Sequence, residues 1–383
     1  MLLIKNGKLM TMNNRLVIDG GDILVDGDRI CNIGQGLKAD NAQVIDAKGG
    51  WVLPGFIDPH CHIGIDEDGN GPMGVDVNEA IDPVTPQMRA IDAINPLDMA
   101  YADAVRYGIT LVATGPGSAN VIGGQFVLMN TFGDTIDDMT VNDCIALKTA
   151  FGENPKRCYG DKGKTPRTRM ATAAVFREIF IKAQEYMKKQ ENPDPDKRPA
   201  CDLKLEAIAK ALRGEIIVKS HAHRADDIAT ALRLGKEFGL RQTIEHCTEG
   251  YLILDTLKKY NATCLLGPII SSRSKIELRN KSNTAPAAFE RAGVRFAFLT
   301  DHPVIPIELM TTQAAICVRE GLSEMGALEA LTINAALALG IEKDYGSLEI
   351  GKKADISIFE NDPLDIRSRT TAVIGRGNIV YER

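Results

Sequence analysis

The pattern of apolar and polar residues divides the chain into three stretches. Residues 1–53 contain brief apolar runs separated by turn residues such as Gly20-Gly21 and Asp26-Gly27, and none of these runs has helical length. This pattern predicts short β-strands. From residue 54 to residue 345, strand-length apolar runs alternate with amphipathic runs of helical length, and short strand-like runs return from Gly346 onward.

The middle stretch predicts a barrel. About eight strand-length runs can be counted between Val52 and Thr300, and the clearest helix is predicted at 169–187, where apolar residues recur on one face. Strands that alternate with helices form a parallel sheet covered by helices, and eight of them favour closure. We therefore expect an α/β protein. It should contain a (β/α)8 TIM-type barrel at 54–345 and a small β-sandwich domain built from residues 1–53 and 346–383.

The composition agrees with a large globular chain. Its 383 residues, 44% hydrophobic and 25% charged, exceed the usual size of one simple core. The net charge of −6 gives no sign of a nucleic-acid surface. No apolar run approaches the ~20 residues of a membrane span, and residues 1–10 lack the pattern of a secretory signal. Eight scattered cysteines without a Cys-x-x-Cys pair predict a reducing compartment, so we expect a cytoplasmic protein.

All six histidines lie at or just beyond the carboxyl ends of predicted strands. His60 and His62 alternate along the first barrel strand and therefore point to one face, whereas Cys61 points to the other. In a barrel these strand ends meet on the face where active sites are built. The sequence thus predicts a histidine-rich metal site at that face. The four remaining histidines are His221, His223, His246 and His302.

Charged residues near the same strand ends are candidates for further roles. Asp301 follows the last barrel strand, where a carboxylate could bind a metal and take a proton from a metal-bound water. Lys148 lies inside the apolar run 145–151, where its amine is costly unless it is neutralised or paired. Carbamylation would make it a carboxylate able to bridge two metals, and Glu153 is a rival carboxylate. The alternative is an outward-pointing Lys148 that reaches solvent between helices.

Other residues are candidates for contacting a substrate. The basic stretch that begins with Lys156 and Arg157 could hold a substrate carboxylate, or it could be a solvated charged loop. The acidic segment 66–87 has the length of a lid or binding element, and it could equally be a solvated surface. His223 could contact the substrate or support a ligand, whereas His302, which precedes a proline, is expected to be structural.

Several segments of the chain form a pattern typical of one known family. They are the segment Pro54-Gly55-Phe56-Ile57-Asp58-Pro59-His60-Cys61-His62, the residues His221, His246 and Asp301 at later strand ends, and the segments 330–336 and 346–355. Through them the chain resembles the metal-dependent amidohydrolase superfamily. The segments His221-Ala222-His223 and Thr243-Ile244-Glu245-His246 are most similar to the imidazolonepropionase-like and prolidase-like branch.

This resemblance implies a metal-dependent hydrolase. His60 and His62 would bind one ion, His221 and His246 would bind a second, and Asp301 would be both a ligand and the general acid/base. Lys148 occupies the position at which members with two metals carry a carboxylated lysine, whereas other members use a glutamate or one metal. We therefore expect one or two divalent ions per chain, zinc first and iron or manganese as alternatives.

The implied reaction is hydrolysis of an amide-type carbon–nitrogen bond. A bound cation lowers the pKa of water from near 15.7 to about 7, and Asp301 would pass the proton to the leaving nitrogen. A dipeptide, an N-acyl amino acid and a cyclic amide are the candidate substrates. We expect a homo-oligomer that acts on small molecules, without a nucleic-acid or membrane partner. The alternatives are deamination of a small heterocycle, a lyase or isomerase step, and a catalytically silent amidohydrolase-like binding protein.

Overall fold

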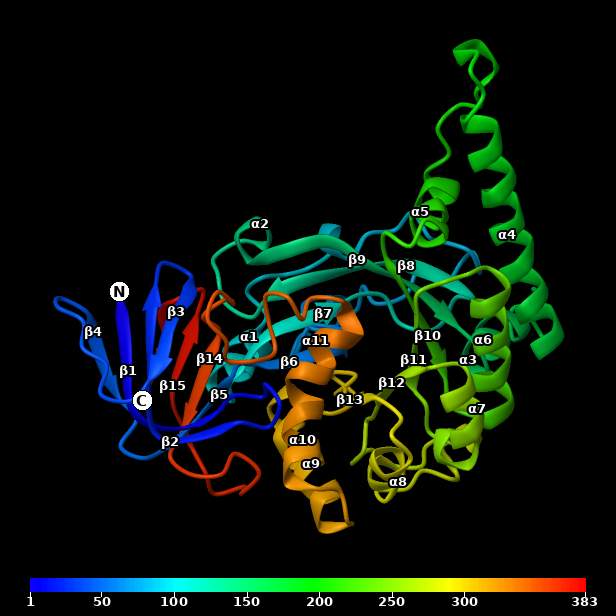
Figure 1. The fold of residues 1–383 in the computed structure, drawn as a ribbon. Helices are drawn as coiled ribbons and strands as arrows, with labels where there is room; N and C mark the ends of the chain where they lie inside the picture. The colour runs from blue at the N-terminus through cyan, green and yellow to red at the C-terminus, as the bar shows by residue number, and fades with distance from the viewer.

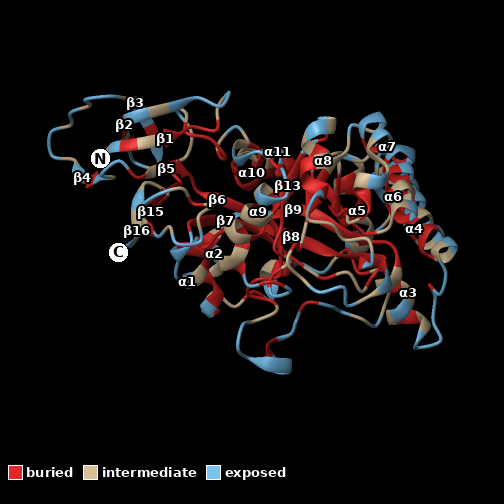
Figure 2. Ribbon diagram, turned by 90° about the horizontal axis from the view of Figure 1, so that it is seen from below, coloured by how far each residue is buried: buried red, intermediate tan, exposed pale blue.

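The computed structural model describes residues 1–383 and has two parts, a barrel and a smaller β domain beside it (Figure 1). Both termini lie in the β domain, so the barrel is the middle of the chain. Figure 2 shows that the buried residues concentrate in the barrel strands and the helix faces against them. No helix is long and apolar enough to cross a membrane.

The barrel sheet contains eight strands that neighbour one another in chain order, with β13 packing beside β6. This arrangement confirms the predicted barrel. The strands are β6 (Phe56–Cys61), β7 (Ile109–Thr114), β8 (Ile122–Asn130), β9 (Thr140–Ala150), β10 (Ile217–Ala222), β11 (Gln242–His246), β12 (Thr263–Leu266) and β13 (Phe296–Phe298).

One strand departs from the all-parallel sheet that we predicted. β8 runs antiparallel to both β7 and β9, whereas the other hydrogen-bonded neighbours in the barrel are parallel. Only the short loop 115–121 joins β7 to β8, and a parallel return needs a crossover of about a dozen residues or more. The reversal places this loop and the start of β8 at the carboxyl ends of the neighbouring strands.

Helices cover the outside of the barrel (Figure 1). The longest, α4 (Arg169–Gln190), confirms the amphipathic helix predicted at 169–187 and starts with a cap in which the Thr168 side chain accepts from the Ala171 N–H. Its buried face includes Phe176 and Phe180. The others are α1 (Met99–Arg106), α2 (Ile136–Met139), α3 (Glu153–Gly160), α5 (Leu203–Leu212), α6 (Ala225–Glu237), α7 (Leu254–Lys259), α8 (Ala285–Ala292), α9 (Met310–Arg319), α10 (Glu324–Leu331) and α11 (Ile333–Leu339).

The small domain joins the two chain ends through one continuous set of hydrogen-bonded strands, which confirms the predicted small β domain built from both ends. The long β1 pairs β2 on one edge, and on its other edge it pairs β4 near the start and β5 near the end. β5 then pairs β14, which connects the C-terminal strands. The strands are β1 (Leu2–Met10), β2 (Val17–Asp26), β3 (Arg29–Gly34), β4 (Gln43–Asp46), β5 (Trp51–Pro54), β14 (Ile356–Phe359), β15 (Thr370–Gly375) and β16 (Asn378–Glu382).

The passage from the small sheet to the barrel occurs at Gly55, between β5 and β6. A Cβ atom at Gly55 would lie 2.2 Å from Thr110 Oγ1, so the close approach of β7 requires glycine there. The predicted boundaries, 53/54 and 345/346, stay our proposal.

Candidate metal centre

Five of the predicted site residues come from the carboxyl ends of four barrel strands. His60 lies in β6 and His62 directly follows it, His221 lies in β10, His246 ends β11, and Asp301 follows β13. His246 and Asp301 have positive φ angles, 67° and 55°. Non-glycine residues rarely adopt this conformation, and such strain is concentrated at functional sites.

A first ligand group consists of His60, His62 and Asp301. Asp301 Oδ1 lies 3.3 Å from His60 Nε2 and 3.2 Å from His62 Nε2. The opposite ring nitrogens face acceptors: His60 Nδ1 is 2.6 Å from Glu245 Oε2, and His62 Nδ1 is 2.6 Å from the Gly115 carbonyl. The contact with Gly115 makes Nδ1 the protonated nitrogen of His62 and leaves its Nε2 lone pair for a metal; for His60, the Glu245 carboxylate beside Nδ1 and the Lys148 amine beside Nε2 favour the same tautomer.

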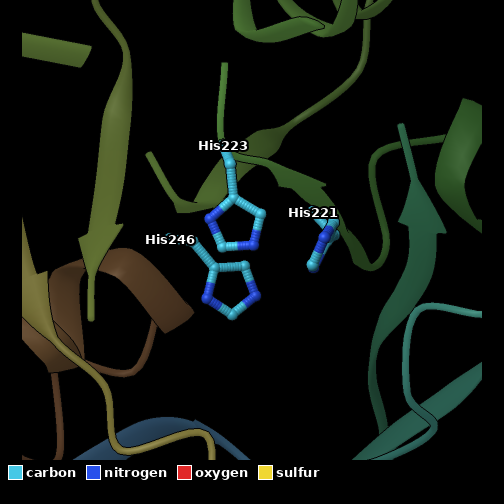
Figure 3. Close-up of side chains that lie close together, drawn as sticks. All are labelled: His221, His223 and His246. Carbon is cyan, nitrogen blue, oxygen red and sulfur yellow. The ribbon is translucent and has the colours of Figure 1, made fainter. Parts of the chain in front are cut away.

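A second ligand group consists of His221, His223 and His246 (Figure 3). The rings of His223 and His246 stack with centroids 4.6 Å apart, and each turns one nitrogen toward His221. His246 Nδ1 donates to the Gly267 carbonyl at 2.9 Å, which leaves its Nε2 lone pair available. His223, expected as a substrate or supporting contact, is placed here among the candidate ligands.

Burial keeps the second group neutral. It lowers the pKa of His246, and burial together with the neighbouring histidines holds the pKa of His221 and His223 well below the usual value. Neutral imidazole is the form that binds a metal. His221 Nδ1 is buried without a hydrogen-bond partner. Both donor sets therefore fit a divalent ion.

Lys148 points into the barrel, so the outward-pointing alternative is wrong. It is 1% exposed, and its Nζ lies 3.1 Å from His60 Nε2. Burial lowers the pKa of Lys148 to about 8, which increases the fraction of neutral, nucleophilic amine. Its rival Glu153 begins α3 and lies outside both ligand groups. Of the two rivals, only Lys148 contacts a histidine of the site.

A buried ion pair lies beneath His60, and our sequence reasoning missed it. Lys219 Nζ lies 3.0 Å from Glu245 Oε2 and donates to the Pro59 carbonyl at 2.9 Å, and neither side chain is exposed. Burial opposes ionisation of Glu245, but Lys219 and His60 outweigh it and lower the pKa of Glu245. The signal in the sequence was strand alternation: Lys219 precedes His221 by two residues and so shares its face.

Asp58 ties the first barrel strand to the segment that carries Asp301. Its carboxylate accepts from the His60 N–H at 3.1 Å and from the Thr300 hydroxyl. Burial raises the pKa of Asp58 to about 7. These contacts fix the backbones of His60 and Asp301 relative to each other.

The loop after β12 brings two further charged residues to the second group, and the sequence reasoning missed both. Glu277 Oε1 lies 3.6 Å from His223 Nε2 and 3.9 Å from His221 Nε2. Lys275 Nζ contacts the same oxygen at 2.7 Å and donates to Asn154 Oδ1 at 3.1 Å. No strand periodicity extends into this loop, so the sequence pattern gave no signal for them.

The predicted substrate contacts lie on α3 and on the long acidic loop. Arg157 is exposed and lines a pocket of 420 Å³ together with Asn154, whose Nδ2 lies 3.4 Å from His221 Nε2. Lys156 is half-buried and does not line this pocket. The loop 66–87 packs on the start of β8, where Thr85 N–H donates to the Ile122 carbonyl at 2.9 Å.

His302 is buried beside this site but belongs to neither ligand group. Its Nδ1 accepts from the Ile307 N–H at 3.2 Å, and its backbone carbonyl accepts from the His62 N–H at 2.9 Å. These contacts agree with the structural role that we expected for it.

Comparison with known proteins connects this geometry to a family. The sequence pattern of the Amidohydrolase family matches residues 51–381. The crystal structure of an amidohydrolase from Thermotoga maritima MSB8 is 40% identical and superposes with a TM-score of 0.97, covering 100% of both chains. At 18% identity, a prolidase complexed with N-methylphosphonate-L-proline shares the fold with a TM-score of 0.64 over 100% of both chains.

Two curated relatives extend the comparison. Amidohydrolase tasK from Hapsidospora irregularis is 27% identical over 90% of this chain, which spans only 38% of the length of that relative. An imidazolonepropionase from Alkaliphilus oremlandii is 24% identical over 93% of this chain and 87% of its own length. The chain therefore belongs to the amidohydrolase family of hydrolases, and it is similar to proteins named imidazolonepropionase and prolidase.

Proposed function

We propose that the chain hydrolyses an amide-type carbon–nitrogen bond of a small molecule, with Asp301 as the general acid/base. The position of Asp301 supports this proposal most directly. Its Oδ1 lies within 3.3 Å of two candidate ligand nitrogens, and its side chain is 16% exposed, whereas the His60 side chain is fully buried. Asp301 is thus the most exposed member of the first group.

The surroundings of Asp301 favour its ionised form, which is the form that can accept a proton. Burial opposes its ionisation, but the surrounding histidines, His246, His60 and His62, outweigh burial and hold the pKa of Asp301 well below its usual range. The ionised carboxylate would take a proton from the attacking water and then deliver it to the leaving nitrogen. One oxygen faces the histidines, so the other is available for the transfer.

The two histidine groups would hold one or two divalent ions, with zinc as the first expectation. A divalent ion in such a site acidifies water and polarises a carbonyl oxygen. His60 and His62 would present Nε2 because Glu245 and Gly115 hold their other nitrogens. Carboxylated Lys148 is our proposal for the bridging ligand, since its amine lies beside His60.

Asp301→Asn tests this function. The variant should lose at least about 10²-fold in kcat on any substrate of the wild-type enzyme, because general acid–base groups contribute about 10²–10⁴-fold. Its bound metal, measured by mass spectrometry, should stay close to the wild-type amount. Asp40→Asn, at an exposed position of the small β domain, is the matched control and should keep normal turnover. Near-normal turnover of Asp301→Asn would exclude Asp301 as the proton-transfer group.

The substrate is to be found by a screen. Dipeptides, N-acyl amino acids and cyclic amides, with small amino-heterocycles as the deaminase arm, should be offered to the zinc-loaded protein. If only the amino-heterocycles react and release ammonia, the proposed reaction would be deamination instead of amide hydrolysis. Failure of every class with metal-loaded, folded protein would favour the catalytically silent alternative.

We also propose a cytoplasmic location and a homo-oligomeric state. All eight cysteines are free thiols, which supports a reducing compartment. The oligomeric state rests on the family resemblance, and sedimentation of the purified protein tests it: a monomer at micromolar concentration would contradict it.

A further inference from the structure

We propose that Asn154 and Arg157 bind the carboxylate of the substrate, which is then an N-acyl amino acid or a dipeptide. This inference deepens the proposed function and rests on an ion being held by the second histidine group. Both residues belong to α3 and line the pocket of 420 Å³, whose walls come from the segments that follow β6, β7 and β9. Asn154 connects this pocket to the second histidine group, because its Nδ2 lies 3.4 Å from His221 Nε2.

Two contacts fix the orientation of the Asn154 side chain. Lys275 Nζ lies 3.1 Å from Asn154 Oδ1, and an ammonium group can only donate a hydrogen bond. The atom that faces Lys275 is therefore the amide oxygen, and the amide nitrogen is the atom that faces His221 and Ser118. One amide N–H donates to Ser118 Oγ at 2.7 Å, so the other is directed toward His221 Nε2.

Binding of an ion leaves this second N–H without an acceptor. An ion on His221 Nε2 would occupy the one lone pair that this nitrogen has. An ion on His221 Nδ1, which is buried without a hydrogen-bond partner, would keep the ring proton on Nε2. In both cases Nε2 accepts no hydrogen bond, so the Asn154 N–H becomes available to a substrate oxygen beside the ion.

The charges around Asn154 favour an anionic substrate. Arg157 lies three residues after Asn154 on α3, so the two side chains are neighbours on the helix surface. Among the charged residues that line the pocket, Arg157 and Lys162 outnumber Asp161, although the whole chain has a net charge of −6. A guanidinium group can bind a carboxylate through two parallel hydrogen bonds. One carbon atom separates the carboxylate from the amide nitrogen in an N-acyl amino acid, so a carboxylate held here keeps the amide close to the second histidine group.

A binding measurement tests the substrate class. The probes are N-methanesulfonyl amino acids and their C-terminal amides, because the sulfonamide bond resists hydrolysis and the two series differ only in the carboxylate. Calorimetric titration of zinc-loaded wild-type protein should find at least one acid that binds about 10-fold or more tightly than its amide, since hydrogen bonds to a charged group are roughly twice as strong as neutral ones. Equal binding of every acid and its amide, or no binding of any acid, would overturn the inference.

Variants assign the residues, with the acid that binds most tightly as the probe. Arg157→Met should remove most of the preference for the acid over its amide. Asn154→Asp keeps an oxygen for Lys275 but replaces the N–H donor by a carboxylate, so it should bind the acid about 10-fold or more weakly, while its zinc content, measured by mass spectrometry, stays at the wild-type amount. Arg233→Met, at an exposed position of α6, is the matched control and should keep the preference. An unchanged preference in Arg157→Met, or unchanged affinity or lost zinc in Asn154→Asp, would overturn the assignment.

The readouts also separate the two proposals. Protein that prefers the acids but hydrolyses no N-acyl amino acid or dipeptide would refute the proposed function alone. Hydrolysis of neutral amides without any preference for a free carboxylate would refute this inference alone.

Discussion

Replacing Glu245 by glutamine tests whether the ion pair beneath His60 supports both the fold and the metal site. Glu245 Oε2 lies 3.0 Å from Lys219 Nζ and 2.6 Å from His60 Nδ1, and all three side chains are fully buried. The substitution keeps the shape and removes the charge. It leaves the Lys219 ammonium with the Pro59 carbonyl but without a carboxylate.

The magnitude follows from this burial. Removing one partner of a buried ion pair typically costs about 3–5 kcal/mol, because the remaining charge is uncompensated. Glu245→Gln should therefore lower the free energy of unfolding by about 3 kcal/mol or more. It should also weaken metal binding about 10–100-fold, because a carboxylate that orients a histidine ligand contributes this much. Both effects have one cause, so they should appear together.

Urea unfolding of metal-free protein and chelator competition of zinc-loaded protein measure the two effects. The double variant Lys219→Met/Glu245→Gln is the control, since it removes both charges and should recover part of the stability that Glu245→Gln loses. It should not recover the metal affinity, because His60 still lacks its carboxylate. A stability loss below about 1 kcal/mol in Glu245→Gln, with unchanged metal affinity, would refute this reasoning.

Two further predictions concern other buried charges. If Lys148 is carboxylated, added bicarbonate should raise the zinc content of the wild-type protein, measured by mass spectrometry, and leave the zinc content of Lys148→Met unchanged. An equal rise in both proteins would contradict carboxylation of Lys148. Burial raises the pKa of Asp355 from 3.8 to about 6, so the folded state holds the proton of this carboxyl group more tightly than the unfolded state does. The free energy of unfolding therefore falls as the pH rises from 3.8 to about 6. The shift is 6 − 3.8 = 2.2, or about 3 kcal/mol at 1.36 kcal/mol per pKa unit. Asp355→Asn should therefore gain about 2 kcal/mol over wild type in urea unfolding between pH 4.5 and pH 7, and a pH-independent difference would contradict it.

Strand periodicity explains which parts of the site could be predicted. His60 and His62 share a face because side chains alternate along a strand, and the barrel brings the ends of distant strands together. The same rule placed His221, His246 and Asp301 near them. Strand alternation and the convergence of strand ends in a barrel are both readable from the sequence, so the histidines could be placed on one face of the barrel before the structure was known.

The parts that could not be predicted depend on tertiary contacts. Glu277 and Lys275 reach the site from a loop, where no periodicity relates sequence position to direction. The reversal of β8 follows from the short loop 115–121, whose length is known only once the ends of β7 and β8 are located. The single sheet of the small domain requires β1 to pair with two strands along one edge, and no local pattern in β1 indicates this.

The contact between Lys148 and His60 shows why carboxylation and metal binding should be linked. Glu245 holds His60 Nδ1, so the lone pair for an ion is on Nε2, and Lys148 Nζ occupies the space beside that atom at 3.1 Å. An ammonium hydrogen-bonded to Nε2 and an ion bonded to Nε2 would compete for one lone pair and repel each other. Carboxylation removes the positive charge and puts a carboxylate in the same space. One modification would therefore remove the competitor of the ion and supply it with a ligand.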